Sequence, residues 1–194
     1  MDTTILKMLY DHKAALTAFE ENGLSAVAAA AVLTTECLRK GGKVLLCGNG
    51  GSAADCQHVA GELVGRFRRE RRGLPAIALT TDASVMTSIS NDYTFENAFA
   101  RAVDALATEN DVLWAFSTSG TSKNILAAAT VAKDKKAQIV AFTGIPKSQL
   151  EKMADVCICS ATEYTSTAQE IHQLAYHIIC NLIEKAFTET ATQK

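Results

Sequence analysis

Hydrophobic positions along the chain follow two different spacings. Residues 5–19 and 25–39 repeat apolar side chains at helical spacing, and the second stretch stops at Gly41-Gly42. Short apolar runs come later, at residues 43–47, 75–79, 111–116, 137–143 and 155–159. Helical patterns also follow, at residues 52–67, between Ser122 and Lys133, and at 167–187. Because strands alternate with helices, the pattern predicts a parallel sheet with helices on both faces.

The chain is expected to form a single α/β domain. Its 194 residues are about one and a third times a typical domain length, and no repeat or linker interrupts them. The predicted architecture is a three-layer α/β/α sandwich with a five-stranded parallel sheet, in which 1–40 form an N-terminal helical arm and 41–194 the α/β core. We expect the arm to pack on the domain or on another subunit.

Composition and charge exclude several classes of protein. Hydrophobic residues make up 48% of the chain and charged residues 21%, which excludes a disordered chain. Lys and Arg number 19 against 21 Asp and Glu, so a nucleic-acid partner is not expected. No apolar run is long enough to span a bilayer, and residues 1–4 show no signal-peptide pattern. The six cysteines lie in apolar or strand-like patterns, as buried free thiols of a cytoplasmic protein do.

Two polar loops follow predicted strands, at the edge where parallel sheets bind ligands. The first, residues 48–52, is rich in glycine and opens a helix, as an anion site does; it also fits a dinucleotide fingerprint or a tight turn without ligand. The dinucleotide interpretation is disfavoured because the next strand lacks an acid at the required spacing. The second loop contains five hydroxyls around Gly120, at Ser117, Thr118, Ser119, Thr121 and Ser122. A helix N-cap needs only one hydroxyl, so this loop predicts a phosphate site.

Two helical pairs are candidates for a metal site. His58 and Glu62 lie four residues apart, and Gln169, Gln173 and His177 form a stripe at the same spacing on the last helix. One pair from each helix would give nitrogen and oxygen ligands in the number that suits zinc. The alternatives are a solvated His–Glu pair and a hydrogen-bonded core histidine. His172 is a candidate supporting residue or a surface residue.

Residues 65–72 hold five arginines. Most are expected to lie on a solvated helix end, and Arg66 is the candidate for neutralising a phosphorylated ligand. A nucleic-acid stripe is the alternative that the acidic net charge disfavours.

The ordered set of motifs resembles the phosphoheptose isomerases of the sugar isomerase (SIS) family. The motifs are Gly48-Asn-Gly-Gly-Ser-Ala-Ala-Asp55, Gln57-His58-x-x-x-Glu62, Gly65-Arg66-Phe67, Asn91-Asp92-Tyr93, Ser117-Thr-Ser-Gly120, and Gln169-Glu-Ile-His172 with His177. The resemblance covers essentially the whole chain. It implies a flavodoxin-like fold and a homotetramer with active sites between subunits. It also implies aldose–ketose isomerisation of sedoheptulose 7-phosphate to D-glycero-D-manno-heptose 7-phosphate, the first step toward the heptose of lipopolysaccharide and other surface glycans.

The resemblance also implies roles for individual residues. The phosphate would be bound by Ser117, Thr118, Ser119 and Ser122, and the sugar by Asn49, Gly50, Gly51, Ser52, Asn91 and Asp92. One Zn²⁺ per subunit would be held by His58, Glu62, Gln169 and His177. Asp55 matches an acid that the family keeps near the reacting carbons. Isomerisation needs a group that moves a proton between adjacent carbons, and our hypothesis is that Glu62 and His177 share this transfer while Gln169 and His58 position zinc and the substrate hydroxyls.

The chain departs from the family pattern at two places. Thr167 stands where a basic residue is usual, and residues 143–147 lack the usual later glycine pair, so contacts to the substrate tail are not fixed by the resemblance. The alternatives are a non-catalytic SIS-family scaffold of the replication-initiator-associating type, and an isomerase or sensor for another phosphosugar.

Overall fold

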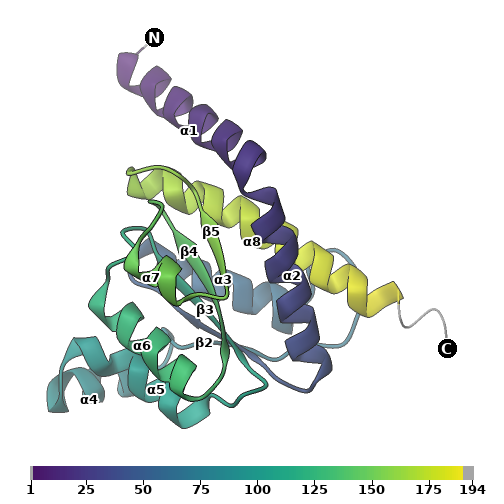
Figure 1. The fold of residues 1–194 in the computed structure, drawn as a ribbon, viewed down its shortest axis with the longest axis vertical. Coiled ribbons are helices and arrows are strands. Elements are labelled where there is room, and N and C mark those ends of the chain that lie inside the picture. Colours follow the sequence, from purple (N-terminus) through teal and green to yellow (C-terminus); the bar gives the residue numbers. More distant parts are fainter. Residues whose placement is uncertain (1, 190–194) are drawn as a thin grey trace.

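The computed structural model describes residues 2–189 and contains a parallel five-stranded sheet (Figure 1). Its strands are β1 (Val44–Cys47), β2 (Ala76–Ala78), β3 (Val112–Ser117), β4 (Gln138–Thr143) and β5 (Val156–Cys159). They lie in the order β2-β1-β3-β4-β5, and every neighbouring pair is parallel. All five predicted strands are therefore confirmed.

Helices cover both faces of the sheet, which confirms the three-layer prediction. Side chains alternate across a strand, so Val44 and Leu46 join one core while Leu45 and Cys47 join the other. The first core lies under α2 (Leu24–Arg39), α3 (Gly51–Val64) and α8 (Thr165–Glu189). The second lies under α5 (Ala98–Leu106), α6 (Lys123–Asp134) and α7 (Gln149–Met153).

The two arm helices are attached differently. α1 (Thr3–Asn22) projects from the body of the molecule and buries only Ala15 and Phe19 (Figure 1). Near its middle, His12 contacts Glu170 of α8 at 2.6 Å, a partner that the sequence did not reveal. α2 instead packs along the sheet and α8, and Thr34 accepts a hydrogen bond from the Trp114 indole at 3.1 Å. Only α1 extends as an arm.

Several helices lie where the hydrophobic pattern predicted no element. Between β2 and β3 the chain forms α4 (Ala83–Asp92), a 3-10 turn η1 (Phe95–Asn97) and α5. α5 packs Phe99 and Val103 on the sheet, whereas α4 buries none of its side chains. The helix predicted at 52–67 ends earlier, at Val64, so the arginines of 66–72 lie on a loop and not on a helix end.

Two predictions from composition can be compared with this fold. All six cysteines are free thiols; Cys157 and Cys159 are half-buried and the other four are buried. Among the described residues 2–189, no helix combines the length and apolarity needed to cross a membrane.

His172 is buried under the sheet and is not a surface residue. Its Nε2 lies 3.0 Å from the Thr143 carbonyl oxygen, to which the neutral ring donates, and its ring meets the Phe142 ring edge-on. Nδ1 has no hydrogen-bond partner. Burial lowers the pKa of His172 from 6.5 to about 4, because the charged ring would lose its hydration.

We predict that His172 makes the fold sensitive to acid. The unfolded chain takes up this proton near pH 6.5 and the folded chain near pH 4, so stability present above pH 6.5 is lost as the pH falls through that window. At pH 5 the loss should be about 2 kcal/mol. His172→Gln keeps an N–H donor for Thr143 but does not titrate, so it should lack this loss in urea titrations at fixed chain concentration. An equal acid loss in both proteins would contradict the prediction.

Candidate active site

The site lies where the strand order reverses. The chain passes from β1 to β2 on one side and then returns to place β3 on the other side of β1. At such a switch point the loops leaving neighbouring strands diverge, which opens a crevice at the carboxyl edge of the sheet. The glycine loop (residues 48–52, after β1) and the hydroxyl loop (residues 117–122, after β3) both leave the sheet there. The two loops singled out from the sequence are therefore neighbours.

Backbone conformation and close contacts shape the glycine loop. Gly50 has a φ of +57°, in the left-handed region that favours glycine, and α3 begins at the next residue. A Cβ at Gly51 would lie 2.6 Å from the Gln169 amide, so a side chain there would displace Gln169. Gln169 itself donates to the Ser52 hydroxyl at 3.5 Å, which links α8 to the loop.

A pair of asparagines joins this loop to the next helix. Asn49 and Asn124 exchange two amide hydrogen bonds, at 2.9 and 2.8 Å. Asn124 lies in the first turn of α6, just beyond the hydroxyl loop. The sequence offered no signal for this contact. It fixes the spacing between the two ligand loops.

The hydroxyl loop gathers its side chains at the N-terminus of α6. Ser117 donates to Ser122 at 3.1 Å and lies 3.4 Å from Ser119. Gly120 has a φ of +64°, and a Cβ there would lie 2.3 Å from Ser148. Hydroxyl groups next to a helix N-terminus are suited to an anion, because unpaired N–H groups and the helix dipole point at it.

Three predicted residues converge between α3 and α8. His58 Nε2 lies 3.1 Å from a Glu62 oxygen and 3.3 Å from His177 Nε2, and the three ligand atoms lie within 4.8 Å of one another. Burial and the neighbouring His58 lower the pKa of His177, which favours the neutral ring with a lone pair available. Each of the three atoms could offer a lone pair to one shared cation. The donor set of two imidazoles and one carboxylate fits a zinc ion.

Tyr176 supports this cluster, and the sequence analysis missed it. Its hydroxyl donates to Asp55 Oδ1 at 3.3 Å and lies 3.1 Å from His58 Nδ1. Because the hydroxyl has only one proton, His58 Nδ1–H must be the donor in the second bond, which leaves Nε2 free to bind a metal. Burial raises the pKa of Asp55, although the Tyr176 hydroxyl acts in the opposite direction. In this structure Asp55 therefore contacts Tyr176, the residue that supports His58.

Three predicted residues lie at the periphery. Asn91 and Asp92 end α4, where Asn91 donates to Asp92 at 3.0 Å and both are exposed. Arg66 extends into solvent and lies 3.8 Å from Glu70. The structure of a single chain does not bring these side chains to the two ligand loops.

Comparison with known proteins assigns this chain to a family. The SIS domain family profile matches residues 9–144. Phosphoheptose isomerase from Roseiflexus sp. (strain RS-1) is 48% identical over 163 residues, covering 84% of this chain and 83% of that protein. The phosphoheptose isomerase of Helicobacter pylori is 43% identical over 187 residues, covering 96% and 97%. The chain belongs to the phosphoheptose isomerase family of SIS-domain proteins.

A solved structure agrees with this family assignment. A phosphoheptose isomerase from Francisella tularensis superposes with a TM-score of 0.91 at 36% identity, covering 95% of this chain and 100% of that one. The resemblance inferred from the motifs and the predicted α/β sandwich are both confirmed. The family motif Gly65-Arg66-Phe67 also gains a physical role, because Phe67 stacks on His177 with ring centroids 5.5 Å apart.

We predict that Tyr176→Phe weakens metal binding. The substitution removes one oxygen and keeps the ring, but it leaves His58 Nδ1–H without its acceptor. Loss of such a supporting bond lowers metal affinity by about 10- to 100-fold. Competition with a chromophoric chelator measures the zinc affinity. Tyr164→Phe, at an exposed tyrosine, is the control, and an equal loss in both variants would overturn the prediction.

Proposed function

We propose that this chain interconverts sedoheptulose 7-phosphate and D-glycero-D-manno-heptose 7-phosphate through an enediolate. The observation that carries the proposal is the His58, Glu62 and His177 cluster between α3 and α8, together with the glycine and hydroxyl loops at the carboxyl edge of the sheet. A proton shuttle and an anion site are the two features that isomerisation of a sugar phosphate needs. Phosphoheptose isomerases at 48% and 43% identity support the choice of substrate.

The two loops would bind the substrate at its ends. In this proposal Ser117, Thr118, Ser119 and Ser122 hold the phosphate at the start of α6. Asn49, Gly50, Gly51 and Ser52 line the sugar. The Gln169 amide lies against Ser52 of the glycine loop. In this proposal Gln169 also contacts the substrate.

Proton transfer would fall to the residues between α3 and α8. Glu62 and His177 share the proton that moves between the first two carbons, and His58 and Gln169 orient the hydroxyl groups there. His58, Glu62, Gln169 and His177 would hold one zinc ion per chain, which when bound polarises the carbonyl and stabilises the enediolate charge. Asp55, which accepts a hydrogen bond from Tyr176, would act next to these groups.

We predict that turnover depends on this cluster. Purified protein should convert sedoheptulose 7-phosphate to the aldose, lose the activity to a chelator, and regain it with zinc. Glu62→Gln and His177→Ala should each lower kcat about 100-fold or more, because each removes a proton-transfer group. The measurement is aldose formed per chain over time.

Three outcomes would contradict the proposal. Full turnover in both variants would remove Glu62 and His177 from the proton path. No turnover of the seven-carbon substrate by folded wild-type protein would favour a scaffold or a phosphosugar sensor, and faster turnover of a six-carbon ketose phosphate would indicate a different isomerase.

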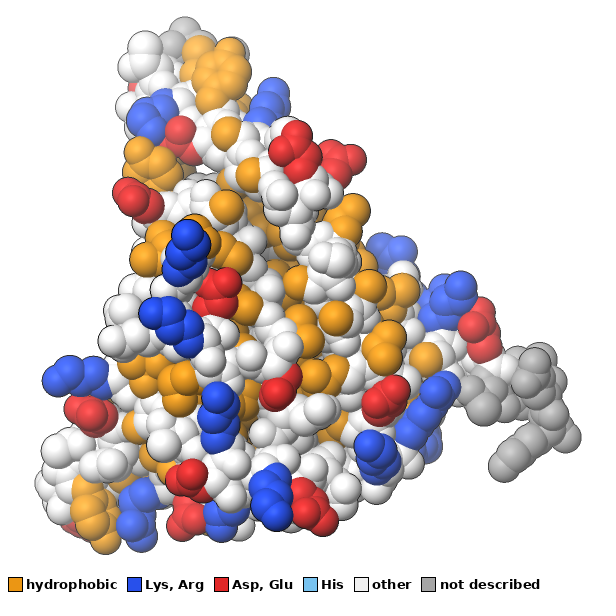
Figure 2. All heavy atoms as spheres, in the orientation of Figure 1, with side chains coloured by type: hydrophobic (Ala, Val, Ile, Leu, Met, Phe, Trp, Pro, Cys, Tyr) orange, Lys and Arg blue, Asp and Glu red, His pale blue; other side chains and the backbone are white. Residues whose placement is uncertain are grey.

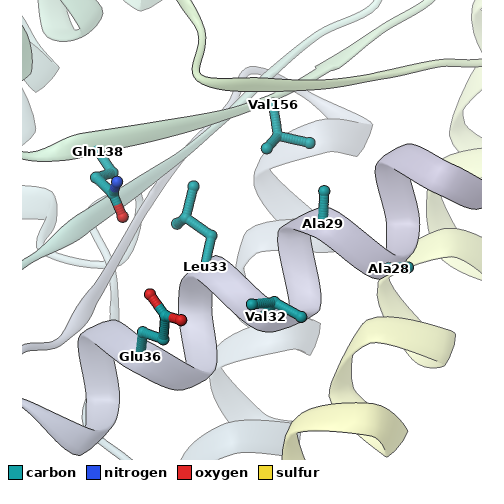
Figure 3. Close-up of a pocket in the computed structure, with 7 residues that line it drawn as sticks. All are labelled: Ala28, Ala29, Val32, Leu33, Glu36, Gln138 and Val156. Carbon is teal, nitrogen blue, oxygen red and sulfur yellow. The ribbon is translucent and has the colours of Figure 1, made fainter.

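We also propose that the chain assembles as a homotetramer with active sites between subunits. α1 exposes Ile5, Met8, Leu9 and Tyr10, each more than half exposed. Apolar side chains also gather where α2 passes over the sheet edge (Figure 2). Ala29, Val32 and Leu33 line a hollow there with Val156 of β5 (Figure 3). Further chains packed on these faces would bury apolar surface and could bring residues such as Asn91 and Asp92 to a neighbouring site.

We predict that the protein sediments with the mass of four chains. A charge at Val32, which is 59% exposed in the single chain, would be desolvated in the assembly. Val32→Glu should therefore lower the sedimenting mass while the circular dichroism spectrum stays unchanged. Lys133→Glu, which introduces the same residue at an exposed position of α6, is the matched control. A wild-type monomer, or an intact tetramer in Val32→Glu, would contradict the assembly proposed.

A further inference from the structure

Glu184 is a fully buried carboxylate far along α8 from the metal cluster. Its two oxygens accept three backbone N–H bonds, from Phe67 at 2.9 Å and from Arg68 and Arg69 at 2.8 Å. Burial alone would raise its pKa, but these donors and the nearby Arg71 hold the pKa of Glu184 below its ordinary value. A buried charge is costly unless it is paired, so this one is bound to a defined stretch of backbone, residues 67–69.

Arg71 completes the arrangement from the other side. Its side chain is 4% exposed, and Nε lies 3.5 Å from Glu184. Its terminal nitrogens donate to the carbonyl oxygens of Glu62 at 2.7 Å and of Leu63 and Gly65 at 2.9 Å. These carbonyls belong to the last turn of α3 and its exit. Glu184 and Arg71, here called the clamp, therefore join α8, the arginine loop and the end of α3.

The clamp holds groups that touch the metal cluster. Phe67, whose N–H is bound by Glu184, stacks on the His177 ring at an interplanar angle of 24°. Glu62, whose carbonyl is bound by Arg71, supplies the carboxylate oxygen 3.1 Å from His58. His177 and Glu184 lie seven residues apart on α8, so they share one helix face. Both helices that carry the cluster are thus connected through Glu184 and Arg71.

We infer that Glu184 is a positioning residue that sets the orientation of His177 by holding Phe67 against its ring. The inference rests on the proposed function for its kinetic test and on the proposed zinc site for its affinity test. A purely structural carboxylate would stabilise the fold without affecting metal binding or kcat, so the two roles give different results.

Asp111 offers a matched control. It is a second buried carboxylate, 2% exposed, and it accepts backbone N–H bonds from Lys43 at 2.8 Å and Thr108 at 2.7 Å. It also pairs with the Lys43 ammonium group at 2.7 Å. It precedes β3, at the sheet edge opposite the ligand loops. Asp111→Asn therefore makes the same chemical change in a similar network that does not touch the site.

The experiment compares Glu184→Gln, Asp111→Asn and wild-type protein. In either orientation, the amide introduced by Glu184→Gln would direct an NH₂ group at a backbone N–H, which releases the segment. Urea titration gives stability, hydrogen exchange gives the protection of the Phe67, Arg68 and Arg69 amides, and chelator competition gives the zinc affinity of the metal-free protein. Turnover of sedoheptulose 7-phosphate gives kcat and KM.

Both variants should lose stability, but only Glu184→Gln should lose amide protection at 67–69. Only Glu184→Gln should also lose about tenfold in zinc affinity and in kcat, with KM within about twofold. Phe67→Leu should reproduce the zinc and kcat losses while keeping the amide protection, and the double variant should be no worse than either single one.

Other results would overturn the inference. Equal losses of zinc affinity in Glu184→Gln and Asp111→Asn would show that stability alone is responsible. Unchanged zinc affinity and kcat in Glu184→Gln would show a purely structural role. If wild-type protein binds zinc but does not turn over the substrate, the proposed function fails, while zinc affinity and amide exchange still decide the role of Glu184.

Discussion

The packing of α8 across the sheet is the constraint on which the rest of the site depends. Five residues of this helix hold the site together: Gln169 at the glycine loop, His172 under the sheet, Tyr176 and His177 at the cluster with His58 and Glu62, and Glu184 at the clamp. Apolar residues between them, including Ile171, Ala175, Ile179 and Ile183, are fully buried in the core. A slip of one residue would turn the helix by about 100° and move all these groups together. Core packing therefore fixes where the site residues of α8 lie relative to their partners on the other elements.

The meeting of α8 with α3 gives the site its electrostatic character. His58, Glu62 and His177 bring three possible metal-ligand atoms within 4.8 Å of one another. The Tyr176 bridge adds to this by holding the His58 proton on Nδ1 and the lone pair on Nε2. A metal that binds only the folded chain also stabilises it by mass action. Assembly of the site and stability of the fold are thus linked at this helix crossing.

The sequence predicted what depends on local pattern. The central strands β1 and β3 are apolar runs buried along their whole length, and the pair His58 and Glu62 shares a face through simple helical spacing. It did not predict α4, whose apolar residues Val85, Met86 and Ile89 share one face but are only half-buried. Nor did it reveal Tyr176 or Glu184, because each acts on residues more than a hundred positions away. Their partners exist only once α8 is packed against α3 and the loop that follows it.

Burial by itself does not separate a stabilising carboxylate from one that serves a site. Asp111 and Glu184 are both buried, both bind backbone N–H groups and both face a basic side chain. Their energetic situation is therefore similar, since each replaces its lost hydration with charge-assisted hydrogen bonds. The difference lies in the segment that each holds. Asp111 holds the turn before β3, whereas Glu184 holds the loop whose Phe67 ring lies on His177, so only Glu184 is placed to affect the orientation of that ring.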